Sequence, residues 1–380
     1  MSINDDRLAD LMTRAAHDLY SMGVISEGTD INEAVIYYKA AALKGLAEAQ
    51  HAIGECYYHG KGVERDYAEA FEWYQKASNQ SYIPSLSAMG RCYLNGYGVE
   101  KSIETALNLI KEAASANDRE GQSILGECYR NGCGVERSPE RALKWTERAA
   151  EQGDENAQFN TAIHYLNGNG TKADPDAAIK WLKRAAENNH AMAMQNLGVI
   201  YDNGELVPQD QKRAFKYFLS AARLGNFMSQ FNVGQCYRQG KGIEKSLDEA
   251  SRWFELSYKN GSTRAPYFLF ICYKEANDSE MAEKWLKIAT EGPDAKVIYQ
   301  VGILYSLGRY VERDDVKAAE LISKAAKCGN SDAQYTYGAF LWQGRGVRES
   351  RDESIKWLKL AAQGGNKNAM EFLRKREIPW

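Results

Sequence analysis

The chain has 380 residues and a formal net charge of −3, with 44% hydrophobic and 26% charged residues. This composition is globular, and the near-neutral charge argues against a nucleic-acid-binding protein, which normally carries a strong basic excess. The first twenty residues lack the basic segment and apolar core of a secretion signal, and no apolar run is long enough to span a membrane. We therefore expect a cytoplasmic protein that binds neither nucleic acid nor membrane.

The charge is distributed unevenly along the chain. Residues 1–69 contain 6 Lys and Arg against 12 Asp and Glu, a net charge of −6, whereas residues 340–380 contain 9 against 5, a net charge of +4. The simpler interpretation is that these charges lie on ordinary solvated helix faces. The alternative is that the two ends of the chain, which carry opposite charge, favour weak head-to-tail self-association.

Two columns of mostly small residues repeat along the chain at a step of 36 residues, which shortens once to 32. Self-similarity at such a period is typical of a stacked repeat array, which needs no division into domains. The first column holds Gly54, Gly90, Gly126, Ala162, Gly198, Gly234, Phe270, Gly302 and Gly338, and the second holds Ala34, Ala70, Ala106, Ala142, Ala178, Ala214, Ala250, Ala282, Ala318 and Ser354.

Each repeat is predicted to form two helices. In the first helix, Ala49, Ile53 and Tyr57 recur every four residues and therefore share one face. The column glycine on this face indicates a close helix crossing, because glycine otherwise destabilises a helix interior. The helix is expected to end at two glycines, such as Gly60 and Gly62, which readily adopt left-handed φ angles. A phosphate-binding loop is disfavoured, since no Gly-Lys-Ser/Thr follows and no strand is predicted before them.

The second helix of each repeat is expected to begin at a short polar residue that caps its first-turn amides. Two of these residues, Ser246 and Ser350, also have a glutamate three residues later, which is the spacing of a capping box. The predicted N-caps are Asp66, Ser102, Ser138, Asp174, Asp210, Ser246, Asp278, Asp314 and Ser350.

Several places depart from the repeat. The eighth pair has 9 residues from Tyr273 to Ala282, where the second pair has 13 from Tyr57 to Ala70, and it lacks both turn glycines. Tyr310 takes the place of the second turn glycine in the ninth pair. After the tenth pair the chain ends in one unpaired, charge-rich helix, which suits a terminal cap.

The repeated pattern A-x-x-x-L-G-x-x-Y-x-x-G-x-G-V-x-x-D-x-x-x-A-x-x-W-Y/L-x-x-A-A-x-x-G resembles the Sel-one-like repeat, which is related to the tetratricopeptide repeat. The resemblance implies an all-α fold, an α/α solenoid that forms a right-handed superhelix and acts as a protein-interaction scaffold, commonly as an adaptor in bacteria. We expect a lead-in at residues 1–14, about ten 36-residue helix-turn-helix repeats at 15–365, and a capping helix and tail at 366–380.

The sequence contains little that indicates catalysis. Five of the seven cysteines share a column with Ile, Leu and Phe, which favours packing thiols in reduced form over disulfides or nucleophiles. His164 lies in the same column and is interpreted as a core residue. His51 and His59 can share a helix face, but no cysteine or carboxylate completes a zinc site. We therefore expect no enzyme, no metal and no cofactor, and a hydrolase-like site with Cys and His is a distant alternative. The column cysteines are Cys56, Cys92, Cys128, Cys236 and Cys272.

The first helices of such superhelices line the concave groove, and their exposed columns are the predicted binding surface. Aromatic side chains there can anchor a partner, and asparagine can bond both the N–H and C=O groups of an extended peptide. A pure packing role is the alternative for the same residues. We expect a scaffold that binds a partner protein or peptide, or alternatively an immunity protein that wraps a toxin or effector enzyme. The predicted partner-binding residues are Phe159, Asn160, Asn196, Phe231, Asn232, Tyr267, Tyr299, Tyr335 and Trp342.

Overall fold

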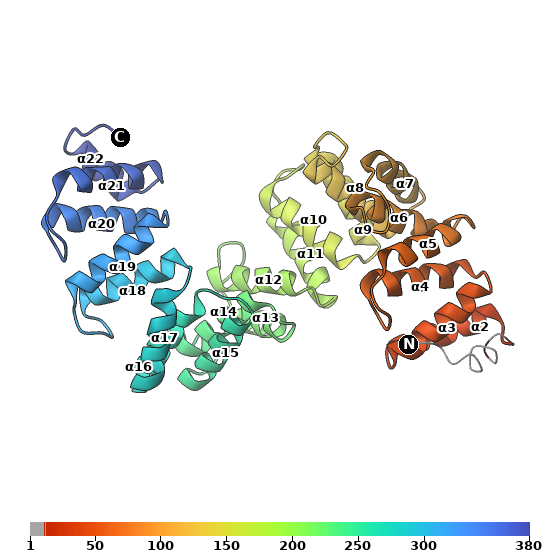
Figure 1. Ribbon diagram of the computed structural model, residues 1–380, viewed down its shortest axis with the longest axis horizontal. Helices are drawn as coiled ribbons and strands as arrows, with labels where there is room; N and C mark the ends of the chain where they lie inside the picture. Colours follow the sequence, from red (N-terminus) through yellow and green to blue (C-terminus); the bar gives the residue numbers. More distant parts are fainter. Residues whose placement is uncertain (1–10, 12) are drawn as a thin grey trace. The chain divides into compact units, whose positions relative to one another are not determined.

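The computed structural model describes residue 11 and residues 13–380, so most of the predicted lead-in lies outside the described residues. All regular structure in the described part of the chain is helical, and no strand occurs there. The all-α fold of stacked helix pairs is therefore confirmed (Figure 1). The chain divides into two units, residues 1–190 and 191–380, and we describe each by itself. The prediction of one continuous domain over 15–365 stays a prediction.

The first unit contains five helix pairs among its described residues. Their first helices are α2 (Ala16–Glu27), α4 (Ala47–His59), α6 (Ile83–Asn95), α8 (Arg119–Asn131) and α10 (Glu155–Asn167). Their second helices are α3 (Ile31–Leu43), α5 (Tyr67–Ser78), α7 (Ile103–Ser115), α9 (Pro139–Glu151) and α11 (Pro175–Glu187).

The second unit contains five further pairs and the unpaired last helix. Its first helices are α12 (Ala191–Asn203), α14 (Phe227–Gln239), α16 (Ala265–Glu275), α18 (Ala295–Leu307) and α20 (Ser331–Gln343). Its second helices are α13 (Gln211–Arg223), α15 (Leu247–Lys259), α17 (Ser279–Glu291), α19 (Asp315–Lys327) and α21 (Arg351–Gln363), followed by α22 (Lys367–Arg374).

The two repeat columns form the seam between the helices of each pair. The alanine column is fully buried, for example at Ala178 and Ala318. The glycine column faces a side chain of the second helix, in most pairs a large one, as Gly198 faces Phe218. Small residues on both helices let the two backbones approach closely, which is why the columns recur in every regular pair.

Eight of the nine predicted N-caps are confirmed, because their side-chain oxygens accept first-turn backbone N–H groups. The exception is Ser350, which begins α21 without such a bond. Neither predicted capping box is complete: at Ser246 only the serine half forms, and at Ser350 neither half does. The carboxylates of Glu249 and Glu353 instead bind Arg252 and Lys356, each at 2.6 Å, because a basic residue lies three positions further along the same helix face.

The cysteine column packs as predicted. All seven cysteines are free, and the five of the column are buried. His164 is also buried, and its Nδ1 lies 2.8 Å from the carbonyl oxygen of Asn169. Both findings confirm that this column belongs to the core.

Candidate functional site

Three tyrosines occupy one register position on successive first helices of the second unit. Tyr267 lies on α16, Tyr299 on α18 and Tyr335 on α20, and each is half-buried. The hydroxyl of Tyr299 lies 3.0 Å from Oγ1 of Thr336, a hydrogen bond between neighbouring first helices. Each of the three tyrosines is thus partly packed and partly exposed to solvent.

Trp342, at the end of α20, lies in a cluster of cationic and aromatic side chains. The guanidinium carbons of Arg351 and Arg376 lie 3.9 and 5.1 Å from the centre of its ring system. Phe372 of α22 contacts it edge-on, with 5.2 Å between ring centres. Trp342 therefore joins the last helix pair to the terminal helix, and it is only partly exposed.

Phe231 is almost completely buried. Its side chain is 6% exposed, and its ring contacts Phe254 and Phe268 at centroid distances of 5.4 and 5.1 Å. Arg264 lies over it, 4.7 Å from the ring centre. The predicted exposure of Phe231 is wrong, because aromatic residues of the next first helix and of its own pair cover the column at this point.

The predicted asparagines differ in how they are bonded. Oδ1 of Asn160 accepts a hydrogen bond of 3.3 Å from Arg130, and the neighbouring Phe159 stacks on His190 at 4.7 Å. Asn196 and Asn232 are half-buried, and no hydrogen bond engages their amide groups within residues 11 and 13–380.

A half-buried ionic cluster in the first unit was missed from the sequence. Arg91 of α6 bonds Glu55 of α4 at 2.7 Å and Glu120 of α8 at 2.5 Å. Its guanidinium group lies 4.1 Å from the ring centre of Tyr58, and the hydroxyl of Tyr74 donates to Glu55 at 2.5 Å. The signal was present, since Glu55 and Arg91 are 36 residues apart in one column with opposite charges. The position of Glu120 beside them came only from the structure.

The two carboxylates of this cluster respond differently to burial. At Glu55, burial alone would raise the pKa, but Arg91 and the hydroxyl of Tyr74 outweigh it and the pKa is lowered. At Glu120, burial outweighs the attraction of Arg91, and nearby Glu55 and Asp118 add to the effect, so its pKa is raised to about 7. Arg91 therefore outweighs the effect of burial on the pKa of Glu55 but not on the pKa of Glu120.

Glu120→Gln should stabilise the first unit at pH 8 and leave it unchanged at pH 4. A carboxyl group whose pKa is raised by folding contributes its full stability at pH values below its pKa in the unfolded chain. That contribution is lost as the pH rises through the folded pKa of about 7. Because about a third of the side chain is exposed, we expect a gain on the order of 1 kcal/mol at pH 8. Urea denaturation at both pH values measures it, with Glu127→Gln, an exposed carboxylate, as control. A loss of stability at pH 8 would show that the Arg91 pair outweighs burial.

The buried cysteines are poor nucleophiles. Burial raises the pKa of Cys56, Cys92, Cys128 and Cys236 to about 12, and that of Cys272 to about 11. Near neutral pH these residues are thiols, whereas the thiolate is the reactive form. Nothing in this column therefore favours the hydrolase-like alternative.

The two candidate metal-binding histidines of the sequence have separate partners. Nδ1 of His51 lies 3.1 Å from Oγ of Ser85, and Nε2 of His59 lies 3.2 Å from a carboxylate oxygen of Glu55. Within residues 11 and 13–380, His, Cys, Asp and Glu side chains nowhere converge in a group of three that could hold a metal ion. Across the same residues, no helix combines the length and apolar character that crossing a membrane requires.

Comparisons with known proteins agree with the helix-pair architecture. A family model described as Sel1 repeat matches nine segments, at residues 9–46, 47–82, 83–118, 119–154, 156–190, 191–226, 228–262, 295–330 and 331–366. The unmatched stretch between 262 and 295 contains the shortened eighth pair. A search of curated proteins finds no match.

Two solved structures resemble the chain over most of its length. One is a protective antigen of uropathogenic Escherichia coli with an SLR fold, 27% identical with a TM-score of 0.68, covering 96% of this chain and 80% of that one. The other is a Sel1 repeat protein from Oxalobacter formigenes, 28% identical with a TM-score of 0.61, covering 80% of this chain and 90% of that one. With its nine matched repeats and this architecture, the chain belongs to the Sel1 repeat family.

Proposed function

We propose that the protein is a non-catalytic scaffold that binds an extended segment of a partner protein along the first helices of residues 191–380. Sel1 repeat proteins generally mediate protein–protein interactions, and the observation that supports this surface is the tyrosine register. Tyr267, Tyr299 and Tyr335 occupy one position on α16, α18 and α20 and keep part of each ring open.

The spacing of such a register suits an extended chain. Packed helices lie roughly 8–10 Å apart, and an extended segment in the polyproline II conformation rises about 3.1 Å per residue with three residues per turn. Side chains on one face of such a segment therefore recur at about the spacing of the tyrosines. The amides of Asn196 and Asn232, on α12 and α14, supply the donors and acceptors that a peptide backbone needs.

Tyr299→Ala and Tyr335→Ala should each weaken partner binding by roughly 1–3 kcal/mol, the effect of losing a typical interface anchor. The partner is first isolated by affinity capture with mass spectrometry, and its affinity for each variant is then measured by calorimetry. Leu307→Ala removes a 66% exposed side chain at the end of α18 and serves as the control. Tyr299→Phe keeps the ring but removes the hydroxyl bond to Thr336, so it shows which of the two contributes to binding.

Two outcomes would contradict this proposal. If both tyrosine variants bind the partner normally, the partner contacts another surface. If they unfold at lower temperature than Leu307→Ala by many degrees, the tyrosines serve packing. An immunity role is a special case of the same binding, and it requires that the captured partner be a toxin or effector enzyme whose own activity falls when this protein is added in equimolar amount.

A further inference from the structure

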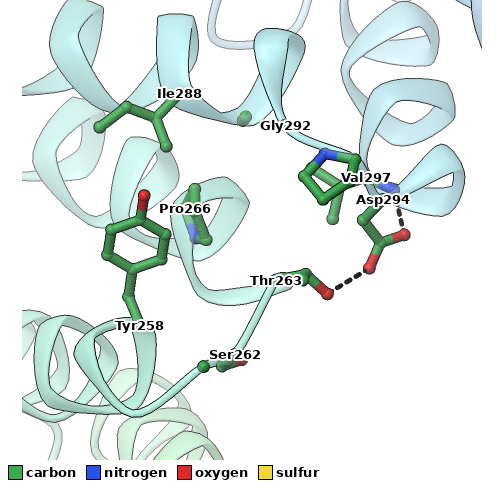
Figure 2. A pocket seen from close by; sticks show the side chains of 11 residues that line it. Tyr258, Ser262, Thr263, Pro266, Ile288, Gly292, Asp294 and Val297 are labelled. Carbon is green, nitrogen blue, oxygen red and sulfur yellow. Dashed lines mark hydrogen bonds between the residues drawn. The ribbon is translucent and has the colours of Figure 1, made fainter.

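The turns of this array differ in the chemistry of their side chains. Where the turn before α16 meets the start of α18, the hydroxyl of Thr263 donates to the carboxylate of Asp294 at 2.8 Å (Figure 2). Among the described residues that line the hollow around this bond, none is a cysteine or a histidine. The turn that follows α8 is different, because it brings two thiols together.

Cys128 and Cys133 occupy two positions that the end of α8 holds close to one another. Gly132 ends the helix with a φ of 73°, and the backbone N–H of Cys133 then donates to the carbonyl of Cys128 at 3.0 Å. With standard backbone dimensions, this bond keeps the two Cα atoms no more than about 6.9 Å apart. A disulfide usually joins Cα atoms about 4.4–6.8 Å apart, so a disulfide can join this pair with little movement of the backbone.

The side chains of the two cysteines also interact. Residues at these two positions commonly contact one another when a helix ends in this way. The pKa of Cys128 is raised to about 12, first by burial and then by its electrostatic interaction and hydrogen bond with the thiol of Cys133. The two sulfur atoms are therefore neighbours.

This pairing of thiols is specific to α8. Among the described first helices, six others end with the same backbone bond from a residue to the carbonyl five positions earlier. The first position is a cysteine at three of those six ends, but the second position never is. The residues at the second position are Lys61, Tyr97, Asn169, Lys241, Arg309 and Arg345.

The two thiols differ in access to solvent. Cys128 is 3% exposed, whereas Cys133 is half-buried and lies between two exposed glycines, Gly132 and Gly134, which have no side chains to cover it. A dissolved oxidant therefore meets Cys133 first. Cys128 is placed to react only with the sulfur of Cys133.

We propose that Cys128 and Cys133 form a redox-responsive dithiol, which a peroxide converts into an intramolecular disulfide at the end of α8. Cys133 gives up its thiol proton and attacks the peroxide, so that an S–O bond forms, the O–O bond breaks, and the departing oxygen takes up the proton and leaves as water. The sulfur of Cys128 then displaces the oxygen from Cys133, and this oxygen leaves with the thiol proton of Cys128 as a second water. Two thiols are thereby oxidised to one disulfide, and one peroxide is reduced.

This disulfide would restrain a turn that contacts the preceding helix pair. A Cβ added to Gly134 would lie 2.3 Å from Ile103 and 2.6 Å from Leu107, both on α7, so the turn is closely packed against that helix. The inference goes beyond the proposed function, because this turn belongs to residues 1–190 and the tyrosine register belongs to residues 191–380.

The test treats the full native chain with hydrogen peroxide, removes the peroxide with catalase, and alkylates the remaining thiols with iodoacetamide in urea. Trypsin cleaves after Arg130, between the two cysteines, so they fall in separate peptides, residues 120–130 and 131–137. We expect mass spectrometry without reductant to find these two peptides joined by a disulfide in most chains. Dithiothreitol should separate them again.

Three variants assign the roles of the two thiols. Cys133→Ser should abolish the linked peptides and leave Cys128 as a thiol. Cys128→Ala should leave a sulfenic acid at Cys133, which dimedone traps in this variant and not in the native chain. Cys328→Ser is the matched control, since it removes the exposed cysteine, and it should give linked peptides as the native chain does.

Three results would overturn the inference. The first is recovery of Cys133 as a thiol from the peroxide-treated native chain. The second is a disulfide from Cys133 to Cys328 of another molecule in place of the link to Cys128. The third is equal dimedone labelling of Cys133 in the native chain and in Cys128→Ala, which would show that Cys128 does not react with the oxidised sulfur.

Discussion

Gly346→Ala should lower the stability of residues 191–380 by about 4 kcal/mol, the largest effect that we expect of any single methyl group in the chain. Gly346 has φ 65°, a conformation that costs an alanine about 1–2 kcal/mol. A Cβ at this position would also lie 1.9 Å from the carbonyl oxygen of Asp315, which is a backbone atom at the first turn of α19 and cannot move alone. Overpacking of this kind typically adds 1–3 kcal/mol.

Gly344→Ala is the matched control for that substitution. Gly344 has nearly the same φ, 66°, but its added Cβ would lie 3.4 Å from the nearest atom, on Glu349. We expect it to cost only the conformational part, about 1–2 kcal/mol. The difference between the two midpoints of urea denaturation therefore measures the contact between neighbouring pairs. Equal midpoints would show that the turn adjusts without disturbing α19.

Gly198→Leu should destabilise the same unit by about 3 kcal/mol through overpacking within one helix pair. An added Cβ alone would lie 2.5 Å from two ring carbons of Phe218, a core side chain that is 3% exposed. The leucine must therefore push α12 and α13 apart or force the ring into another rotamer. Circular dichroism during urea denaturation measures the shift in midpoint.

Two further variants show whether the ring is the obstacle. Gly28→Leu makes the same substitution at an ordinary φ of −80° with nothing within 4 Å, and it should have almost no effect. Combining Phe218→Ala with Gly198→Leu should cost less than the sum of the two single changes, because the smaller side chain vacates the crossing. If the double variant is as unstable as the sum of the single changes, the crossing is not where the leucine acts.

The helices and their ends could be predicted from the sequence because they depend on interactions between residues close together in the chain. Asp66 caps α5 by bonding amides two and three residues later, and Gly60 ends α4 by adopting a left-handed φ. The recurrence of such local signals every 36 residues then required the helix pairs to stack. The same reasoning placed Cys128 and His164 in the core, since a column shared with Ile, Leu and Phe must be buried.

The candidate sites depended on contacts between neighbouring repeats, and the repeat sequence does not show which residues make those contacts. The sequence indicated that both glycines of each turn adopt a left-handed φ, whereas the structure shows that the second one, Gly346, also leaves room for the backbone of α19. The sequence also placed Phe231 among the exposed aromatic residues, but Phe268 of the next first helix packs against Phe231.

What the sequence by itself determined is therefore the fold and its register: helix pairs, their caps, their close crossings and a buried cysteine column. The tertiary structure alone decided which side chains keep an open face. Burial against the neighbouring helix pair raises the pKa of Glu120 although Arg91 lies beside it. Burial and free hydrogen-bonding capacity are properties of an environment assembled from several repeats, so they emerge only when the repeats are stacked.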